Sequence, residues 1–172
     1  MGVTIHFEGQ LKNDEVSYKG IIEEAIAFAD SYGMEHKPIY EACKKLSRVR
    51  EEEPWDYEGP VKGLKIILDD HCDPLFLEFD ETLYIQEFIK TQFVGAETHI
   101  IVIQLLRSFK KFFVNLIVED EAEYWDTSDK KLLEEHIAKV NSVIEDQLKS
   151  NPKLSGPVRS SDGRILDLVE ND

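Results

Sequence analysis

The sequence VKGLKIILDDHCDPLFLEFD, from Val61 to Asp80, determines what the rest of the chain folds around. Apolar residues alternate along both of its halves, as they do on the buried face of a strand: Leu64, Ile66 and Leu68, then Leu75, Leu77 and Phe79. Asp69–Pro74, between the halves, is rich in the residues that turns prefer. We therefore expect two neighbouring strands, 61–68 and 75–80, that form a hairpin at the centre of a sheet.

The segments around this hairpin alternate between strand and helix patterns. Period-two alternation predicts further strands at 3–8 and 114–121, with shorter candidates at 89–93 and 165–169. Apolar residues at helical spacing predict helices at 14–32, 96–113 and 128–149. The pattern indicates an α+β fold: a single domain with a mixed or mostly antiparallel sheet of about four to six strands and a central hairpin, packed by three or four helices.

Two further segments have less regular patterns. Pro38 suits the first turn of a helix, and the spacing of Ile39, Cys43 and Leu46 predicts a short helix with Cys43 as a small core residue. Residues 83–93 fit neither period cleanly. There we expect a helix or irregular structure in the first half and a strand in the second.

The composition changes after Ser150. The segment NPKLSGPVRSSDGR has the Pro, Gly and Ser content of a linker. We therefore expect one domain over residues 1–150, followed over residues 151–172 by a linker and a short tail that docks on its own sheet or on a second copy of the chain.

Acidic residues dominate the charge of the chain. It has 35 Asp and Glu against 20 Lys and Arg, a formal net charge of −15 over 172 residues. Lys and Arg neutralise phosphates in nucleic-acid complexes, so nucleic acid and anionic membrane surfaces are poor partners for this field. The longest dense apolar stretch, Ile100–Leu106, is far shorter than the roughly 20 residues of a membrane span. We expect a protein partner, basic by charge complementarity, or a second copy of the chain.

Cysteine usage and the first residues indicate the compartment. Cys43 and Cys72 form no C-x-x-C pair and no small-domain disulfide pattern, which favours the reducing cytosol. The first residues lack the basic and apolar regions of a signal peptide. We expect a cytoplasmic protein with the general character of bacterial cytosolic proteins.

The usual catalytic and nucleotide-binding motifs are absent from the sequence, among them G-x-x-x-x-G-K-[ST], G-x-G-x-x-G, H-E-x-x-H and G-x-S-x-G. His6 falls on the polar face of the strand at 3–8, where we expect an ordinary surface residue. His99 falls in the first turn of a predicted helix, where we expect it to pack. These observations favour a non-catalytic protein, and no cofactor is predicted.

The turn of the central hairpin contains the one metal-ligating pattern that we consider. Asp69, His71 and Asp73 alternate, and carboxylates with an imidazole on one side of an extended segment can hold a divalent metal. Cys72 faces the opposite way from His71 in such a segment, so the two do not form a catalytic dyad. The alternative function is therefore a metal-dependent, hydrolase-like enzyme built on these three residues, although Asp is also simply common in turns.

Two acidic loops share aromatic residues. Pro54 and Gly59-Pro60 predict that Glu51–Glu58 is an exposed loop, and Glu119–Asp129 has a similar composition. Trp, Tyr and acidic side chains together are typical of surfaces that bind basic proteins. The candidate binding residues are Trp55, Asp56, Tyr57, Glu121, Tyr124, Trp125 and Asp126. The alternative is that the loops lie apart and their tryptophans cover the core.

Overall fold

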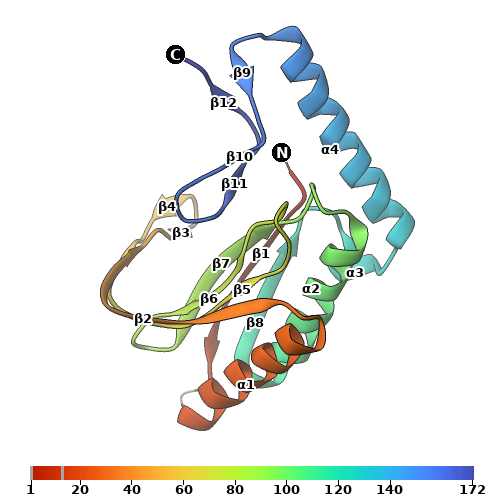
Figure 1. Cartoon of the computed structure of the whole chain (residues 1–172). Helices are drawn as coiled ribbons and strands as arrows, with labels where there is room; N and C mark the ends of the chain where they lie inside the picture. The colour runs from red at the N-terminus through yellow and green to blue at the C-terminus, as the bar shows by residue number, and fades with distance from the viewer. Residues whose placement is uncertain (1, 13) are drawn as a thin grey trace.

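The central hairpin forms the middle of the structure, as the sequence predicts. β5 (Tyr57–Ile67) and β6 (Leu75–Phe79) pair antiparallel, with Leu64 opposite Leu77 and both side chains buried. β2 (Glu35–Leu46) pairs antiparallel with the other edge of β5, so this sheet has the order β2-β5-β6. The computed structural model in Figure 1 describes residues 2–12 and 14–172.

A second antiparallel sheet has the order β7-β1-β8. It consists of β7 (Tyr84–Lys90), β1 (Thr4–Leu11) and β8 (Phe113–Asp120). A tight turn joins β6 to β7, in which the Leu83 N–H donates to the Asp80 carbonyl and the Asp80 N–H donates to the Tyr84 carbonyl, both at 3.0 Å. This short connection places the two sheets side by side (Figure 1).

The strand β7 corrects one prediction. Its first half is extended, so the helix or irregular structure expected at the start of 83–93 is wrong. Ile85, Glu87 and Ile89 form the buried series of this strand. Because one of the three buried positions carries a carboxylate, the apolar alternation that would have indicated a strand is interrupted.

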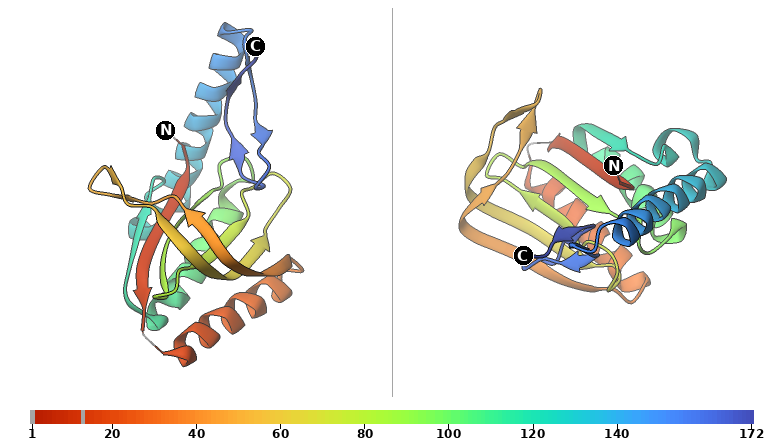
Figure 2. Two further views of the ribbon diagram at one scale, coloured as in Figure 1. Left: turned by 90° about the vertical axis from the view of Figure 1, so that its left-hand side faces the viewer. Right: turned by 90° about the horizontal axis from the view of Figure 1, so that it is seen from above.

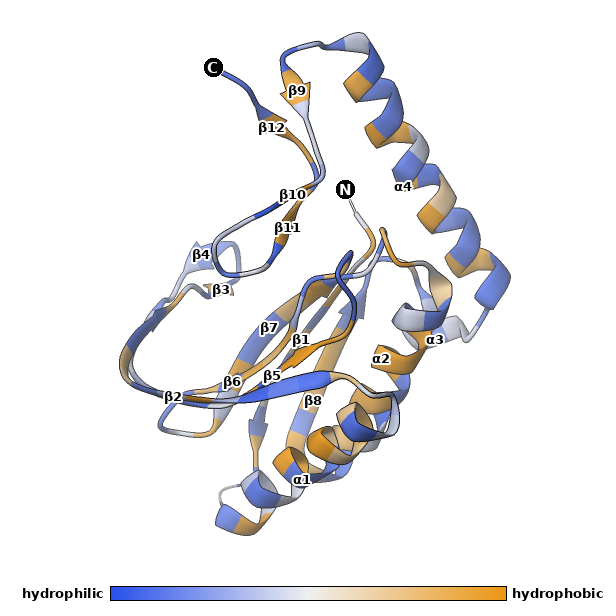
Figure 3. Cartoon of the chain, viewed as in Figure 1, coloured by the Kyte–Doolittle hydropathy of each residue, from blue (hydrophilic) through white to orange (hydrophobic). Residues whose placement is uncertain are grey.

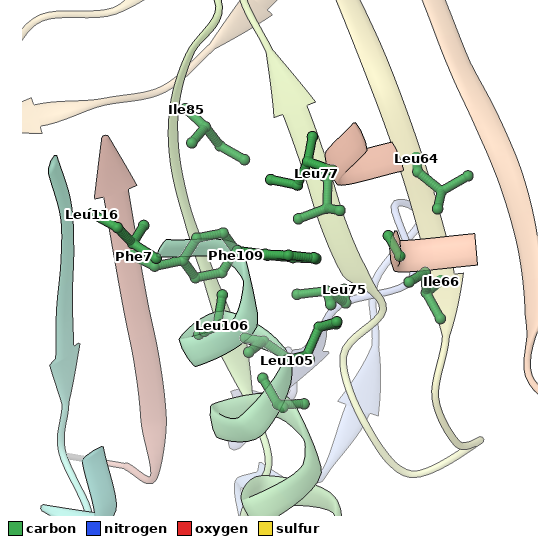
Figure 4. Packing of buried hydrophobic residues seen from close by; sticks show 14 of the residues in the cluster. Phe7, Leu64, Ile66, Leu75, Leu77, Ile85, Leu105, Leu106, Phe109 and Leu116 are labelled. Carbon is green, nitrogen blue, oxygen red and sulfur yellow. The ribbon is translucent and has the colours of Figure 1, made fainter. Parts of the chain in front are cut away.

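Two helices cover one face of both sheets. α1 (Glu15–Ser31) begins at Asp14, whose carboxylate accepts from the Ser17 N–H at 2.6 Å. α2 (Ala96–Phe109) continues through a 3₁₀ turn (Lys110–Phe112) into β8. Figure 4 shows Leu105, Leu106 and Phe109 of α2 in the same cluster as residues of both sheets. Each fully buried Leu, Ile or Phe side chain stabilises the fold by about 1.5–3 kcal/mol relative to an exposed one.

The helix α4 (Lys130–Ser150) builds a smaller second core with the start of the chain. The short helix α3 (Tyr124–Thr127) precedes it, and the Asp129 carboxylate caps α4 by accepting from the N–H groups of Lys131 and Leu132. Hydrophobic bands recur along α4 between hydrophilic ones (Figure 3), as expected for a helix buried on one side. The buried residues of this core are Val3, Ala122, Leu133, Ile137, Val140 and Ile144.

A hairpin arm extends from the end of β2. It contains β3 (Val49–Arg50) and β4 (Glu53–Pro54), which pair antiparallel, and its tip stands away from the sheets in Figure 2. Glu51 and Glu52 make the turn at positive φ. Residues 53–54 lie in β4 and residues 57–58 in β5, so the irregular structure predicted for Glu51–Glu58 is wrong at these positions. Trp55 and Asp56, between the two strands, have no regular structure.

The short helix predicted at Pro38 is also wrong, because these residues belong to β2. Pro38 lies opposite Leu64 in an edge strand, where its missing N–H is tolerated. The pairing shifts between Glu41 and Lys44, a bulge that contains Cys43. Cys43 is therefore exposed, and its predicted place in the core is wrong as well.

Residues after α4 form two small antiparallel pairs. β9 (Leu154–Ser155) pairs with β12 (Val169–Glu170), and β10 (Val158–Arg159) pairs with β11 (Ile165–Leu166). The strand predicted at 165–169 is thus divided between two of these pieces. We refer to residues 151–172 as the tail; the division between a domain and a tail at Ser150 stays a prediction.

The predicted fold class is confirmed. Among the residues described, four α-helices pack on antiparallel sheets around one main core, which is a single-domain α+β arrangement. No helix in the described part of the chain combines the length and the apolar character that a membrane span requires.

Candidate functional site

A groove of about 700 Å³ lies between the hairpin arm and the second sheet. Its floor is the face of β7-β1-β8 opposite the helix-covered face. Its wall is formed by Ser47 and Arg48, which follow β2, and by Val49, Pro54 and Asp56. The residues that line it are His6, Phe7, Glu8, Ser47, Arg48, Val49, Pro54, Asp56, Gln86, Glu87, Phe88, Ile117, Glu119 and Glu121. Its volume is within the range of ligand-binding clefts.

The lining of the groove is acidic around an apolar centre. Five of the described lining residues are acidic, and one of them, Glu87, is buried and paired with Arg164. Arg48 is the one arginine or lysine among these lining residues, and it is already paired with Asp80. Phe88 is 37% exposed and Ile117 is 54% exposed. Hydrophobic groups surrounded by acids form a surface that is complementary to a basic partner.

Arg48 anchors the arm at the end of β2. Its guanidinium donates to the Asp80 carboxylate at 2.7 Å, and both side chains are almost completely buried. The rings of Trp55, Tyr57 and Tyr84 surround it with centroids 5.1–5.3 Å from the guanidinium carbon. Burial alone would raise the pKa of Asp80, but the hydrogen bonds from Arg48 and from its own turn outweigh burial and lower it.

Gln86 fixes the distance between the arm and the floor. Its side-chain oxygen accepts from the Val49 N–H and its amide nitrogen donates to the Val49 carbonyl, both at 2.8 Å. The same nitrogen donates to the Glu8 carboxylate at 2.9 Å, and the Tyr84 hydroxyl donates to that carboxylate at 2.5 Å. The groove therefore has a hydrogen-bonded floor before any partner binds.

Glu87 is a buried carboxylate at one end of the groove. It pairs with Arg164 of the tail, whose guanidinium donates to it at 2.7 Å. Burial raises the pKa of Glu87 to about 7; the Arg164 charge opposes this rise and the nearby Glu78 carboxylate adds to it. The charge of Glu87 consequently changes close to neutral pH.

A buried Thr–His–Asp arrangement lies under the second sheet, on the side away from the groove. The Thr91 hydroxyl is 2.8 Å from Nδ1 of His99, and Nε2 of His99 is 3.1 Å from the Asp120 carboxylate. Asp120 also accepts from the N–H groups of Ala122 and Trp125. Thr91 and His99 are fully buried, so a substrate does not reach them. The packing role expected for His99 includes this network.

The structure separates the aromatic residues that the sequence analysis singled out. Trp55 and Tyr57 turn inward around Arg48, and Asp56 lines the groove with Glu121. Tyr124 and Trp125 lie over the main core and near the Arg107 guanidinium, which donates to both of their carbonyls. Asp126 is exposed and does not line the groove. Of the seven candidate binding residues, Asp56 and Glu121 line the groove, together with Pro54 and Glu119 of the same two segments.

The turn of the central hairpin places its candidate ligands apart. His71 Nδ1 is 3.2 Å from an Asp69 oxygen on the surface. Asp73 is buried, and its two oxygens accept from the N–H groups of Ile165 and Lys90 at 2.7 and 3.0 Å. Among the residues that the structure describes, no group of three or more His, Cys, Asp or Glu side chains is arranged to hold a metal ion.

Cys72 next to this turn is buried and its thiol donates to the Lys90 carbonyl. Burial, with the charges of Asp73 and Asp69, raises the pKa of the Cys72 thiol. A thiol in this environment is protonated at neutral pH and is a poor nucleophile.

Several groove residues were missed by sequence analysis. The polar series of the first strand, with His6 and Glu8, indicated an accessible face, but nothing in it showed that the arm would stand over that face. Arg48 carried no sequence signal, because its partner Asp80 is 32 positions away. Glu87 stands between two buried isoleucines of its strand, and this charged residue at a buried position was the one sequence feature that could have indicated a functional carboxylate.

Comparisons of the chain with protein-family models, with curated proteins and with solved structures found no match. The chemistry of the groove is therefore the basis for a functional proposal.

Proposed function

We propose that this chain is a non-catalytic binding protein that holds a basic segment of a protein partner in the groove. The observation that carries the proposal is the excess of carboxylates over free cations in the groove lining. Glu8 and Glu119 stand on the adjacent strands β1 and β8, Glu121 follows the end of β8, and Asp56 lines the groove on the arm side. A segment with alternating cationic and apolar side chains is complementary to this surface.

The apolar centre of the groove supports a protein ligand over a free cation. Phe88 and Ile117 are partly exposed between the acids, and Val49 of the arm is 58% exposed. Partly exposed apolar side chains within a polar rim are typical of protein-binding sites. Charge then supplies orientation and association rate, and apolar contact supplies much of the affinity.

A binding measurement tests this proposal. The probe is a fluorescent octapeptide of alternating Arg and Val, and the reference is the same peptide with Glu in place of Arg. Fluorescence anisotropy at low and high salt should show binding of the Arg peptide alone, with affinity that falls as salt rises, because a Debye length of roughly 8 Å at 0.15 M screens exposed charges.

Matched double variants locate the binding. Glu119→Gln with Glu121→Gln removes two groove charges, and the Gln at 121 keeps an oxygen that accepts from the Thr4 N–H. Glu134→Gln with Glu145→Gln removes the same charge from the exposed face of α4. We expect about fivefold to tenfold weaker binding for the groove variant, with little change for the α4 variant. Equal losses in both, or equal binding of both peptides, would contradict the proposal.

A further inference from the structure

We infer that the site occupied by Arg164 is an arginine-binding site at the inner end of the groove, which the tail fills and which an arginine of the partner takes over on binding. This inference rests on the proposed function. It adds the identity of the cationic side chain, arginine, and a role for the tail as a tethered competitor.

Contacts on three sides define the site. The guanidinium carbon of Arg164 lies 4.0 Å from the ring centre of Phe88 on β7 and 4.7 Å from that of Phe76 on β6. One guanidinium nitrogen donates to the Glu87 carboxylate at 2.7 Å, and the other donates to the Phe88 carbonyl at 2.8 Å. Aromatic rings with a carboxylate and a carbonyl acceptor match a planar guanidinium better than an ammonium group.

The arginine site and the groove share two residues. Glu87 and Phe88 line the groove and also contact Arg164. Phe88 remains 37% exposed although Arg164 lies over its ring. If an extended segment of the partner binds on the groove floor, one of its side chains can therefore reach the site that Arg164 occupies.

The other attachments of the tail at this point are mostly polar. Its strands are two residues long, and Ile165 is its one buried residue between 151 and 172. The polar contacts beside Arg164 are Ile165 N–H to Asp73 at 2.7 Å, Lys90 to the Ile165 carbonyl and to Asp167 at 3.1 and 2.9 Å, and Arg159 to the Asp70 carbonyl. Leu168 is partly buried against the second core. Release of this segment therefore exposes little apolar surface, and most of what holds it is polar contact that a bound partner segment can replace.

Exchange of one arginine for another keeps the charge balance of the site. Glu87 is buried beside Glu78, which Lys44 already pairs at 2.7 Å, so an empty site would leave Glu87 without its cation. A partner arginine restores the same ion pair that Arg164 gave. The tethered arginine competes at an effective concentration of roughly millimolar, which lowers the apparent affinity for the partner.

Substitution of the tail arginines tests the inference in the full chain. Arg164→Gln removes the competitor. Arg159→Gln removes the same charge from the same tail outside the site, since Arg159 donates to the carbonyls of Asp70 and Gly163. With the labelled Arg/Val octapeptide we expect about fivefold to tenfold tighter binding to Arg164→Gln than to wild type, and no gain for Arg159→Gln. A Lys/Val octapeptide should gain less, because Lys lacks the planar fork.

Amide hydrogen exchange on the wild type provides a second readout that no substitution affects. Saturation with the Arg/Val octapeptide should increase exchange at residues 158–168, where the tail is released. If the wild type binds the peptide, but Arg164→Gln binds no more tightly than Arg159→Gln and tail exchange is unchanged, the inference is overturned and the proposed function stands. If no protein binds the peptide, both are overturned.

Discussion

The carboxylate of Glu87 lies 2.7 Å from a guanidinium nitrogen of Arg164, although 77 positions separate the two residues in the sequence. This ion pair joins the tail to the strand β7 at Glu87, which also lines the groove. Because Glu87 is buried and its pKa is raised to about 7, the pair is sensitive to pH near neutrality.

Glu87 should make stability decrease as pH rises. Its carboxyl group binds a proton more tightly in the folded chain than in the unfolded one, so its contribution is fully present below its ordinary pKa of 4.5 and is lost as pH rises to about 7. Between pH 5 and pH 8 the free energy of unfolding of wild type should fall, relative to that of Glu87→Gln, by on the order of 2–3 kcal/mol. Urea unfolding at several pH values measures this difference. Glu135→Gln on the exposed side of α4 is the control, and parallel curves for wild type and Glu87→Gln would contradict the prediction.

The Arg48–Asp80 pair should be much more important for stability than an exposed pair on the same segment. Arg48→Met leaves a buried carboxylate without its cation, and we expect a loss of about 3–5 kcal/mol in the free energy of unfolding. Lys45→Met breaks a pair with Asp56 whose lysine is 65% exposed, and we expect a loss within about 1 kcal/mol. Chemical denaturation followed by circular dichroism measures both. Similar losses in the two variants would show that the buried pair has no special role.

The network around Asp120 should depend on a carboxylate and not merely on side-chain size. Asp120 accepts from His99 and from two backbone N–H groups, so Asp120→Asn places an amide NH₂ where a donor already points. We expect a loss of about 2–4 kcal/mol in the free energy of unfolding, since a buried polar group is left without its partner. Asp126→Asn, at an exposed position of α3, should change stability by less than about 0.5 kcal/mol. Equal stability of the two variants would argue against the network.

The two cysteines should react with a thiol reagent at very different rates. Cys43 is exposed in the bulge of β2, whereas Cys72 is 1% exposed and its thiol has a raised pKa. In folded protein, a colorimetric thiol reagent should label one equivalent quickly, and the second only after denaturant is added. Cys43→Ser should abolish the fast phase. A fast phase that survives this substitution would place Cys43 in the core, as the sequence alone had indicated.

The central hairpin and the long helices could be predicted because their apolar residues follow one period without interruption. The strand β2 could not, because an edge strand with few buried residues keeps little alternation, and the bulge at Cys43 shifts what remains. Ile39, Cys43 and Leu46 then matched a helical spacing by coincidence. Pro38, which suggested the start of a helix, is equally acceptable on a sheet edge.

The candidate site was harder to predict than the fold. Asp56 and Glu121 were among the expected binding residues, and the structure places both in the groove. The two tryptophans were predicted to bind a partner because of their residue type. The local sequence does not determine whether their rings point to the surface or to the core. The ring of Trp55 lies near Arg48 and packs edge-on against Tyr84 of β7. Tyr84 is far from Trp55 in the sequence, so this packing cannot be predicted from the local pattern.

The side chain of Gln86 offers Val49 one acceptor and one donor, which is what a peptide group of a neighbouring strand would offer. The arm is thus held over the face of β7 by side-chain hydrogen bonds and not by a ladder of backbone pairs. Arg48 adds a second link of this kind, since its guanidinium donates to the Tyr84 carbonyl at 3.3 Å. The position of one wall of the groove therefore depends on side chains that single substitutions can remove, whereas the position of a paired strand depends on its backbone.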